Sequence, residues 1–428
     1  MKENELIYDT YEKPPIAKWI ILALQHVFAM FGATILVPIL VNQQAGYEVI
    51  TVPVALLSSG IGTLLYILCT KGKSPVYLGS SFAFISPIAV AFAKDGLSGF
   101  STGIITVGII YILVSLLIKL FGKDWIKKVL PPIIVGPMIM IIGLSLAPNA
   151  IKQIGLLGDS IEIKTFIVAF ISFLVTSLTA IYAKGFFKVI PFLIGIITGY
   201  ICSIALGLVD FTPVSNSSFF SLPRILIPLK DYTFSLSGML TMAPLAFVSI
   251  AEHIGDHMAL STIINKDLTK DPGLDKTIMG DGLATLFAGL IGGPANTTYG
   301  ENTSVVGMSK VASVWVIALA AIFSICMAFL GTITTIFSTI PDPVLGGVSL
   351  LLYGFISVNG LKVLIENKVD FNNLRNVIIA STMLILGLGG ATISFTSGDI
   401  SFSLTGMSLA ALVGIILNLL LKNKKEEK

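Results

Sequence analysis

Three carboxylates lie inside stretches that are otherwise apolar: Glu252 and Asp256 in IAEHIGDH (250–257), and Glu301 in NTTYGEN (296–302). A charge held at the centre of a bilayer is costly, so an acidic residue kept there is a functional candidate by default. Glu252 and Asp256 are four residues apart and share one face of a helix. Carboxylates in such places can accept hydrogen bonds from ligand N–H groups or carry a proton. The alternative is a structural role at a buried break or, for Asp256, as an anchor for a hydroxyl or N–H.

The histidines follow the same pattern. His253 and His257 lie on the face adjacent to the carboxylates, and His26 holds the corresponding position in an earlier stretch, QHVFAMFGATILVP (25–38). We expect His26 and His253 to support proton movement, although His26 suits a packing or orienting role as well. His257 and Asp281 are expected near the cytoplasmic end of their helices.

These residues do not form a metal or enzyme motif. Zinc sites of the HExxH type need a glutamate directly after the first of two histidines that are four residues apart. Here Ile254 follows His253, and no third ligand is evident. The three cysteines have no CxxC spacing, and no nucleophile–base set appears. We therefore expect no enzyme activity and no cofactor, with the proton as the coupling ion.

The ligand that suits two carboxylates and free backbone amides is a small planar molecule with alternating N–H and C=O groups on its edge. A pyrimidine-dione or an oxopurine fits this description. Phe82, Tyr299 and Tyr353 could supply apolar or stacking walls. Amino acids and small anions stay open as alternatives on this argument alone.

The composition identifies the environment of these residues. The chain has 428 residues, of which 54% are hydrophobic and 12% charged, against about 25% charged in soluble domains. The mean hydropathy is +0.92. These values predict a polytopic membrane protein, and the net charge of +3 without a basic tract argues against nucleic acid as a partner. Residues 1–18 are charged and followed by a run long enough to span, so we expect no cleavable signal peptide.

Hydropathy and charge together predict fourteen membrane segments. Twelve are near-continuous apolar runs, and two, 76–93 and 296–310, are interrupted by Gly, Ser and Pro. With fourteen segments and a cytoplasmic N-terminus, 22 of the 27 Lys and Arg residues fall on the cytoplasmic side. Twelve segments would place the 266–276 cluster outside. Both termini are therefore expected in the cytoplasm, and the protein in the cytoplasmic membrane.

The two interrupted segments indicate an internal repeat. PVYLGSSFAFISP (75–87) resembles NTTYGENTSVVGMS (296–309), and two further pairs of stretches match in the same order at similar offsets. Two halves of seven segments each, an odd number, must lie inverted in the membrane, which is typical of secondary transporters. We predict repeats at 14–210 and 235–421.

Interrupted segments need a reason, because backbone in lipid must have hydrogen-bond partners. We predict that segments 3 and 10 each begin as a short β-strand and continue as a half-helix. The two strands would pair antiparallel and satisfy each other. The half-helix N-termini would then offer N–H groups and partial positive charge to a ligand. The fold class expected is otherwise all-α.

The motifs resemble those of the nucleobase–ascorbate transporter family, also called nucleobase:cation symporter type 2. The resemblance runs from about Pro14 to the last segment. The stretches that carry it, which are specific as a set, are LQHVFAMFGATILVP (24–38), GIGTLLY (60–66), YLGSSFAFISP (77–87), IAEHIGDH (250–257), KDPGL (270–274), NTTYGEN (296–302) and GGVSLLLYG (346–354).

The resemblance implies proton-coupled uptake of uracil by alternating access. It implies a substrate-carrying core domain, about 14–122 and 235–335, that moves against a gate domain, about 125–210 and 340–421. The gate domain would support a homodimer, with membrane lipid as the other partner. Glu252 would bind an N–H and carbonyl edge of the substrate, Glu301 a second N–H, and the backbone amides of Phe82 and Gly300 its carbonyls. The residues implied to line the pocket are Ala33, Tyr299, Ser349 and Tyr353.

The chain departs from the family pattern at three positions. Ser304 and Ser309 replace the usual Gly and Thr, and Asp256 stands where some members carry histidine. The first change bears on substrate preference and the last on the proton route. A xanthine or other oxopurine permease is the alternative within the family. An anion carrier with the same inverted repeats is the alternative outside it, although two glutamates in the pocket argue against an anion.

Overall fold

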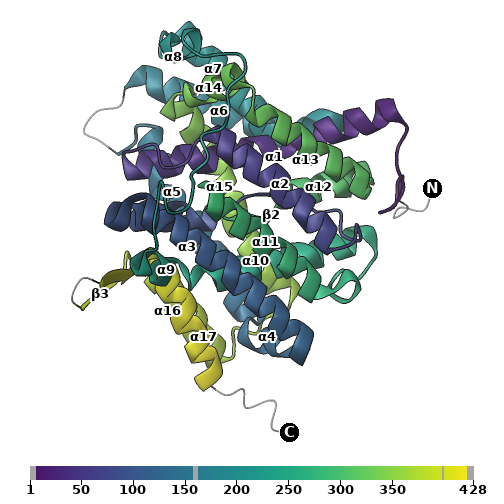
Figure 1. The fold of residues 1–428 in the computed structure, drawn as a ribbon, viewed down its shortest axis with the longest axis vertical. Coiled ribbons are helices and arrows are strands. Elements are labelled where there is room, and N and C mark those ends of the chain that lie inside the picture. The colour runs from purple at the N-terminus through teal and green to yellow at the C-terminus, as the bar shows by residue number, and fades with distance from the viewer. Residues whose placement is uncertain (1–5, 158–161, 398–399, 422–428) are drawn as a thin grey trace.

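The computed structural model describes residues 6–157, 162–397 and 400–421, most of them helical (Figure 1). By length and composition, seven of the described helical stretches can cross a membrane, or eight if one pair bent by 83° counts as a single span. The seven are Ile16–Ala45 (α1), Val52–Cys69 (α2), Phe82–Phe121 (η1 and α3), Pro132–Gln153 (α5), Ile163–Tyr182 (α6), Leu236–Ile264 (α9 and α10) and Asp342–Glu366 (α15). The chain is thus a multi-pass membrane protein, while the count of fourteen segments stays a prediction.

The remaining helices are shorter or less apolar. The bent pair consists of Val314–Ala328 (α13) and Gly331–Ser338 (α14). The others are Asp124–Val129 (α4), Pro191–Ala205 (α7), Thr212–Ser215 (α8), Leu274–Ile291 (α11), Gly300–Ser309 (α12), Leu374–Leu388 (α16) and Gly406–Leu420 (α17).

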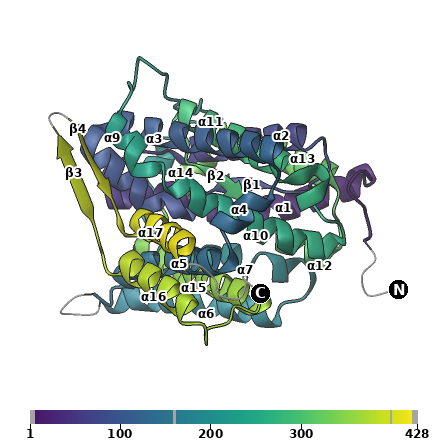
Figure 2. The ribbon, with the colours of Figure 1, turned by 90° about the horizontal axis from the view of Figure 1, so that it is seen from below.

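The helices form two groups that face each other (Figure 2). In the first helix group, α11 packs on α3 and α2, and α13 packs on α2 and α1. In the second helix group, α15 packs on α5 and α6, and α16 packs on α17 and α5. Within both groups small residues allow close helix contact, as where Gly360 of α15 lies on the backbone of Gly136 in α5. Contacts of α10 with α5 and of α1 with α7 join the groups.

Two short strands from distant parts of the chain meet inside the first helix group. β1 (Leu78–Ser80) pairs antiparallel with β2 (Asn296–Thr298), with Gly79 opposite Thr297. On the outer edges of this two-stranded sheet, backbone N–H groups donate hydrogen bonds to hydroxyl groups of neighbouring helices. Thr63 of α2 accepts from the Leu78 N–H at 3.0 Å, and Thr285 of α11 accepts from the Asn296 N–H at 3.2 Å. Extended backbone is therefore tolerated here because protein covers every side of it.

Each strand continues into a helix. β1 leads through the 3-10 turn η1 (Phe82–Phe84) into α3 (Ile85–Phe121), and β2 leads through Tyr299 into α12. A straight helix over Phe82–Phe121 would be about 60 Å long, twice the hydrocarbon thickness. The chain instead breaks within α3 at Asp95 and Gly96, where Gly96 has φ 58°. This break lies where the sequence predicts the end of its third segment.

A β-hairpin between α16 and α17 differs from the all-α expectation. Its strands β3 (Ile393–Ser397) and β4 (Ile400–Leu404) pair antiparallel in the edge position seen in Figure 2. β4 packs on α9 of the first helix group, and Lys94 donates to Ser403 Oγ at 2.7 Å. The sequence predicts a thirteenth membrane segment over 374–393, but α16 ends at Leu388, where Gly389 and the left-handed Gly390 (φ 70°) follow. The Ser and Thr residues that alternate with apolar ones from Ile393 then favour a strand.

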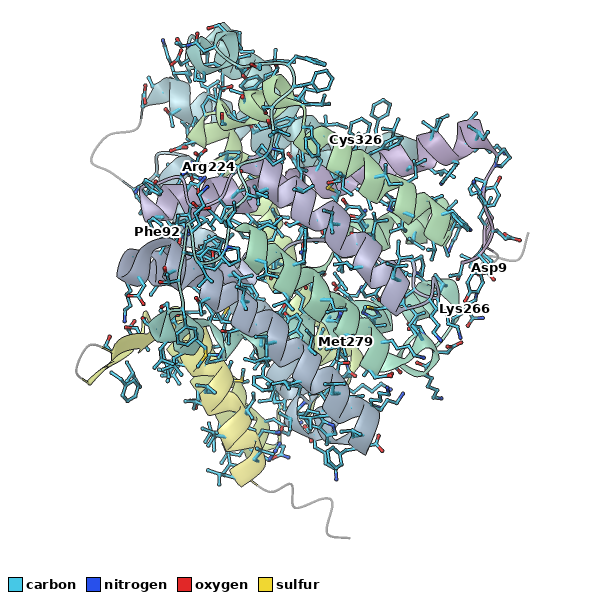
Figure 3. The ribbon with its side chains drawn as sticks, in the orientation of Figure 1. Asp9, Phe92, Arg224, Lys266, Met279 and Cys326 are labelled. Atoms are coloured by element: carbon cyan, nitrogen blue, oxygen red, sulfur yellow. The ribbon has the colours of Figure 1, made fainter. Side chains whose placement is uncertain are left out.

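The segment before α1 lies along the ends of α10 and α12. The Ile7 N–H donates to the Lys310 carbonyl at 2.7 Å, and Tyr8 forms a parallel bridge with Val311. Asp9 pairs with Lys266 at 2.5 Å, as the neighbouring labels in Figure 3 indicate. This segment therefore ties the far end of the second half-helix to the loop after α10.

Candidate substrate site

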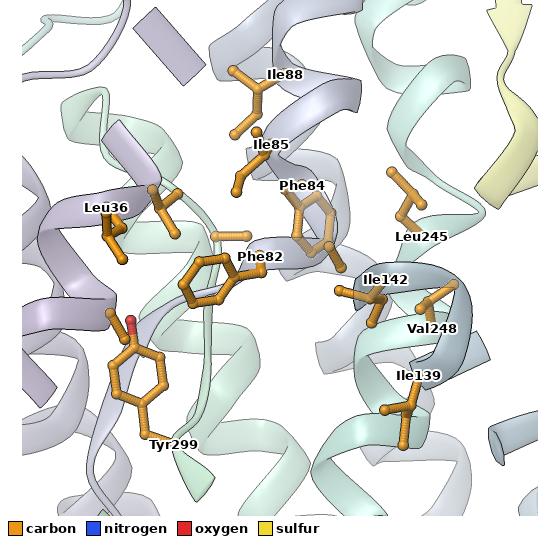
Figure 4. Close-up of a cluster of buried hydrophobic side chains, with 14 of the residues drawn as sticks. Leu36, Phe82, Phe84, Ile85, Ile88, Ile139, Ile142, Leu245, Val248 and Tyr299 are labelled. Carbon is orange, nitrogen blue, oxygen red and sulfur yellow. The ribbon is translucent and has the colours of Figure 1, made fainter. Parts of the chain in front are cut away.

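The candidate site lies in the first helix group, where α10 (Leu245–Ile264) passes the paired strands. α10 contacts η1, β2 and α12, so it lies beside both broken segments. Figure 4 shows Phe82 projecting from η1 toward the side of the cluster that holds Tyr299 and Leu36 of α1. Segments near residues 30, 80, 250 and 300 thus converge on one place.

The carboxylates of α10 and α12 lie in the same region. Glu252 lies within electrostatic range of Asp256 and Glu301, and all three are only partly exposed. Glu301 lies in the first turn of α12, where the partial positive charge of the helix N-terminus favours a carboxylate. Asp256 Oδ2 accepts a hydrogen bond from Thr298 Oγ1 at 2.8 Å, which ties α10 to β2. The two glutamates on which the sequence argument depends are thus brought together.

Tyr299, from the second predicted repeat, contacts two residues of the first predicted repeat beside the site. Its hydroxyl donates to the Ser80 carbonyl at 3.0 Å and accepts from Thr34 Oγ1 of α1 at 3.2 Å. Its ring lies over Gly79, where a Cβ would collide with it. Ala33, which is 5% exposed, is the neighbour of Thr34 on α1.

α15 of the second helix group supplies a further wall. The rings of Phe82 and Tyr353 meet edge-on, with centroids 6.4 Å apart and an interplanar angle of 73°. Ser349 lies one helical turn before Tyr353. Among the described residues, the hydroxyls of Ser349 and Tyr353 and the Oε2 atom of Glu252 are buried without a hydrogen-bond partner. Unpaired buried polar groups are costly, so these atoms suit a polar ligand that supplies the missing partners.

Gly300 begins α12 directly after Tyr299, and the helix has no side-chain cap at this end. The nearest atom to a Cβ built on Gly300 is Asp256 Oδ1, at 3.9 Å. The first amides of α12 therefore border the carboxylate cluster with open space beside them. This geometry suits a carbonyl oxygen of a ligand.

His26 and His253 occupy different surroundings from each other. Asn302 of α12 donates from Nδ2 to both Nδ1 and the carbonyl of His26, each at 3.1 Å. This contact fixes α12 against α1 and favours the orienting role for His26. His253 Nδ1 instead contacts Asp281 Oδ2 of α11 at 2.7 Å, and its Nε2 contacts Thr277 Oγ1 at 2.9 Å.

A buried polar chain behind α10 is the feature that the sequence argument missed. The rings of His253 and His257 stack at 3.9 Å, and His257 Nε2 contacts the Tyr66 hydroxyl of α2 at 2.6 Å. Asp281 and His257 are 1% and 0% exposed, so they belong to the interior of the bundle. The sequence feature that could have indicated this chain is Asp281, because it is an acidic residue inside the apolar run 277–293. In the described part of the chain, no cluster of His, Cys, Asp and Glu could hold a metal ion.

Comparisons with known proteins identify the family of the chain. Residues 17–395 match the model of the Permease family. The chain is 45% identical to the uracil permease of Bacillus subtilis (strain 168), over 100% of this chain and 98% of that one. It is 43% identical to the uracil permease of Bacillus caldolyticus, over 99% and 96% of the two chains.

Solved structures show the same fold at low sequence identity. The transmembrane domain of the cyanobacterium bicarbonate transporter BicA covers 96% of this chain and all of its own, with a TM-score of 0.59 and 16% identity. The structure of SLC26A9 gives a TM-score of 0.66 at 14% identity, over 95% of this chain and 66% of that one. The chain shares the fold of these solved structures. The chain belongs to the Permease family, and the family resemblance inferred from its motifs is confirmed.

Proposed function

We propose that the protein is a proton-coupled symporter that imports uracil across the cytoplasmic membrane. The observation that carries the proposal is the convergence of Glu252 and Glu301, beside two half-helix starts, in a chain that resembles uracil permeases over its whole length. Uracil is a planar ring whose N–H and C=O groups alternate along one edge. Carboxylates complement the N–H groups and backbone amides complement the carbonyls.

Each site residue has a role in this proposal. Glu252 binds an N–H and carbonyl edge of uracil, and Glu301 accepts from the second N–H. The backbone amides of Phe82 and Gly300 donate to its carbonyls. Phe82 and Tyr353 enclose the ring, with their edge-on contact as one wall. The pocket lining is completed by Ala33, Tyr299 and Ser349.

Proton coupling is assigned to the same cluster. Glu252 carries the proton, and Asp256, within electrostatic range of it, adjusts its protonation. His26 and His253 support this proton movement, and their hydrogen bonds to Asn302 and Asp281 hold the two rings in place. A neutral Glu252 is the form that can cross the membrane at low cost.

The two helix groups are the moving parts. We propose fourteen segments in two inverted repeats, with the first helix group as the substrate-carrying core and the second as the gate. Uracil and the proton load from outside, the core moves against the gate, and both leave inside. Both termini lie in the cytoplasm, and two copies associate through their gate domains.

The test is uptake of labelled uracil into proteoliposomes under an imposed pH gradient. Acid outside should drive accumulation, and a protonophore should remove it. Glu252→Gln should nearly abolish gradient-driven uptake, whereas Glu366→Gln, on an exposed helix end, should not. Wild-type rate and pH profile in Glu252→Gln would show that coupling resides elsewhere. Competition by xanthine and hypoxanthine decides between a pyrimidine and an oxopurine substrate.

A further inference from the structure

A polar surface cavity lies apart from the candidate site, at the end of α3 and the start of α11. Its volume is about 370 Å³, and its walls come from the end of α3, the corner before α4 and the loop between α10 and α11. Lys119 and Lys123 come from the first two of these elements, and Lys270 comes from the loop. The sequence places all three lysines on the cytoplasmic side.

The charges around this cavity do not balance. Lys123 Nζ donates to the carbonyl and to the hydroxyl of Thr269, both at 3.1 Å, and both acceptors are neutral. Lys270 lies 3.4 Å from Asp267 in an exposed pair, and Asp275 lines the cavity. The lining itself holds three lysines and one aspartate, while Asp267 lies outside it within electrostatic range of Lys123. Lys119 makes no ion pair with any residue that the structure describes.

The surface next to the cavity is apolar. The last turns of α3 expose Leu116, Leu117, Leu120 and Phe121 by 40–75%. The corner that follows carries Lys127 and Lys128, both exposed, on α4. An apolar stretch that ends in a group of lysines matches a phospholipid, whose chains lie along the helix while its headgroup reaches the cations. Basic pockets between membrane helices on the cytoplasmic side bind acidic headgroups in this way.

We propose that this cavity binds the phosphate headgroup of an acidic phospholipid. The phosphate contacts Lys119 and Lys123 on one side and Lys270 on the other, so the lipid fastens the α3–α4 corner to the α10–α11 loop. This corner is where the chain leaves the first helix group for the second. The proposal rests on the membrane placement of the chain and not on its substrate.

The experiment measures lipid binding to the purified full-length protein in a neutral detergent. Phosphatidylglycerol, phosphatidylcholine and soluble glycerol 1-phosphate are titrated separately, with native mass spectrometry and the thermal melting temperature as readouts. Wild type should bind phosphatidylglycerol saturably and be stabilised by it, with little effect of the other two. The triple variant Lys119→Gln, Lys123→Gln and Lys270→Gln should bind it at least about tenfold more weakly.

The matched control is the triple variant Lys184→Gln, Lys362→Gln and Lys368→Gln, which removes the same charge from exposed sites on the same predicted side. It should bind phosphatidylglycerol as wild type does. Equal losses in both triple variants, or none in the cavity variant, would overturn the proposal. Glycerol 1-phosphate that binds at this site as tightly as the lipid would overturn the lipid assignment. Lys119→Gln alone serves if the triple variant does not fold. No uracil enters the assay, so the transport proposal can fail without affecting this one.

Discussion

The two interrupted segments have the same backbone arrangement but carry different side chains at equivalent positions. Both contain a three-residue strand followed by a helix start, and the strands pair with each other. Two residues past the strand end, the first segment has Phe82 and the second has Gly300. Three residues past it, the first has Ala83, which is buried, and the second has Glu301. Only the second segment therefore brings a charge to the site.

This difference shows how an inverted duplication can specialise. The first segment, which continues into the long helix α3, contributes backbone groups and an aromatic wall. The second ends after the ten-residue helix α12 and is held by side chains, with Asp256 bonded to Thr298 and Asn302 bonded to His26. Side chains of neighbouring helices also hold the first segment, where Thr63 and Ser59 of α2 bond to Leu78.

The largest loss of uracil binding is expected when Glu301 of the second segment is replaced by alanine, the residue type at the equivalent position of the first. Glu301→Ala removes a charged acceptor, and hydrogen bonds to charged groups are worth about 1.5–3 kcal/mol, so uracil should bind roughly 10- to 100-fold more weakly. Stabilisation of the purified protein by uracil in thermal melts measures this. Glu366→Ala, an exposed glutamate, is the control and should bind normally. Undiminished stabilisation in Glu301→Ala would remove this carboxylate from the site.

Glycine substitutions in the two segments should differ in stability. A Cβ at Gly79 meets the ring of Tyr299, so Gly79→Ala should destabilise the protein by about 1–3 kcal/mol through overpacking. The matching Gly300→Ala has only Asp256 Oδ1 nearby, at 3.9 Å, and should leave the melting temperature almost unchanged. Similar melting temperatures for the two variants would mean that the Tyr299 ring does not lie against Gly79.

Removing the hydroxyl of the tyrosine in each segment should lower stability by different amounts. Tyr299→Phe loses the bond to the Ser80 carbonyl that crosses between the halves, at a cost of about 0.5–1.5 kcal/mol. Tyr77→Phe loses a contact with Ser59 Oγ, which keeps its 2.6 Å bond to the Leu78 carbonyl. Chemical unfolding in detergent should therefore rank Tyr299→Phe as the less stable. The reverse order would assign the stronger link to the first half.

The smallest change in stability is expected at the ion pair between Asp9 and Lys266, near the end of the second segment. The hydrogen bond from Lys266 holds the pKa of Asp9 below its ordinary value of 3.8. A lowered pKa means that the stabilisation is present above pH 3.8 and disappears as the pH falls through the pKa of the folded state. The difference in melting temperature between wild type and Asp9→Asn should therefore shrink in acid. In a Lys266→Gln background, which lacks the donor, Asp9→Asn should change the melting temperature less at neutral pH. An undiminished difference there would contradict the role of this ion pair.

Some of the site was predictable and some was not. The breaks near Gly79 and Gly300, and the acids Glu252 and Glu301, stand out because polar and flexible residues are rare in apolar runs. The contact of His253 with Asp281 could not be predicted, since it depends on which faces of α10 and α11 meet. The same holds for Thr63 and Thr285, whose hydroxyls satisfy the strand edges. The β3–β4 hairpin did have a signal, the alternation of apolar residues with Ser and Thr in ISFTS and ISFSL.

The sequence by itself determined the membrane environment, the places where apolar segments break and the types of residue that could bind a ligand or a proton. These properties depend on composition and on local spacing, because the cost of burying charge or unpaired backbone in lipid acts on each segment separately. Only the tertiary structure decided which side chains hold the paired strands in place and which residues of α11 and α2 the histidines contact. It also decided which hydroxyls are left without partners. Those outcomes depend on how helices pack, in places across more than 200 residues as between His26 and Asn302, where hydrogen-bond geometry over a few ångströms selects one arrangement.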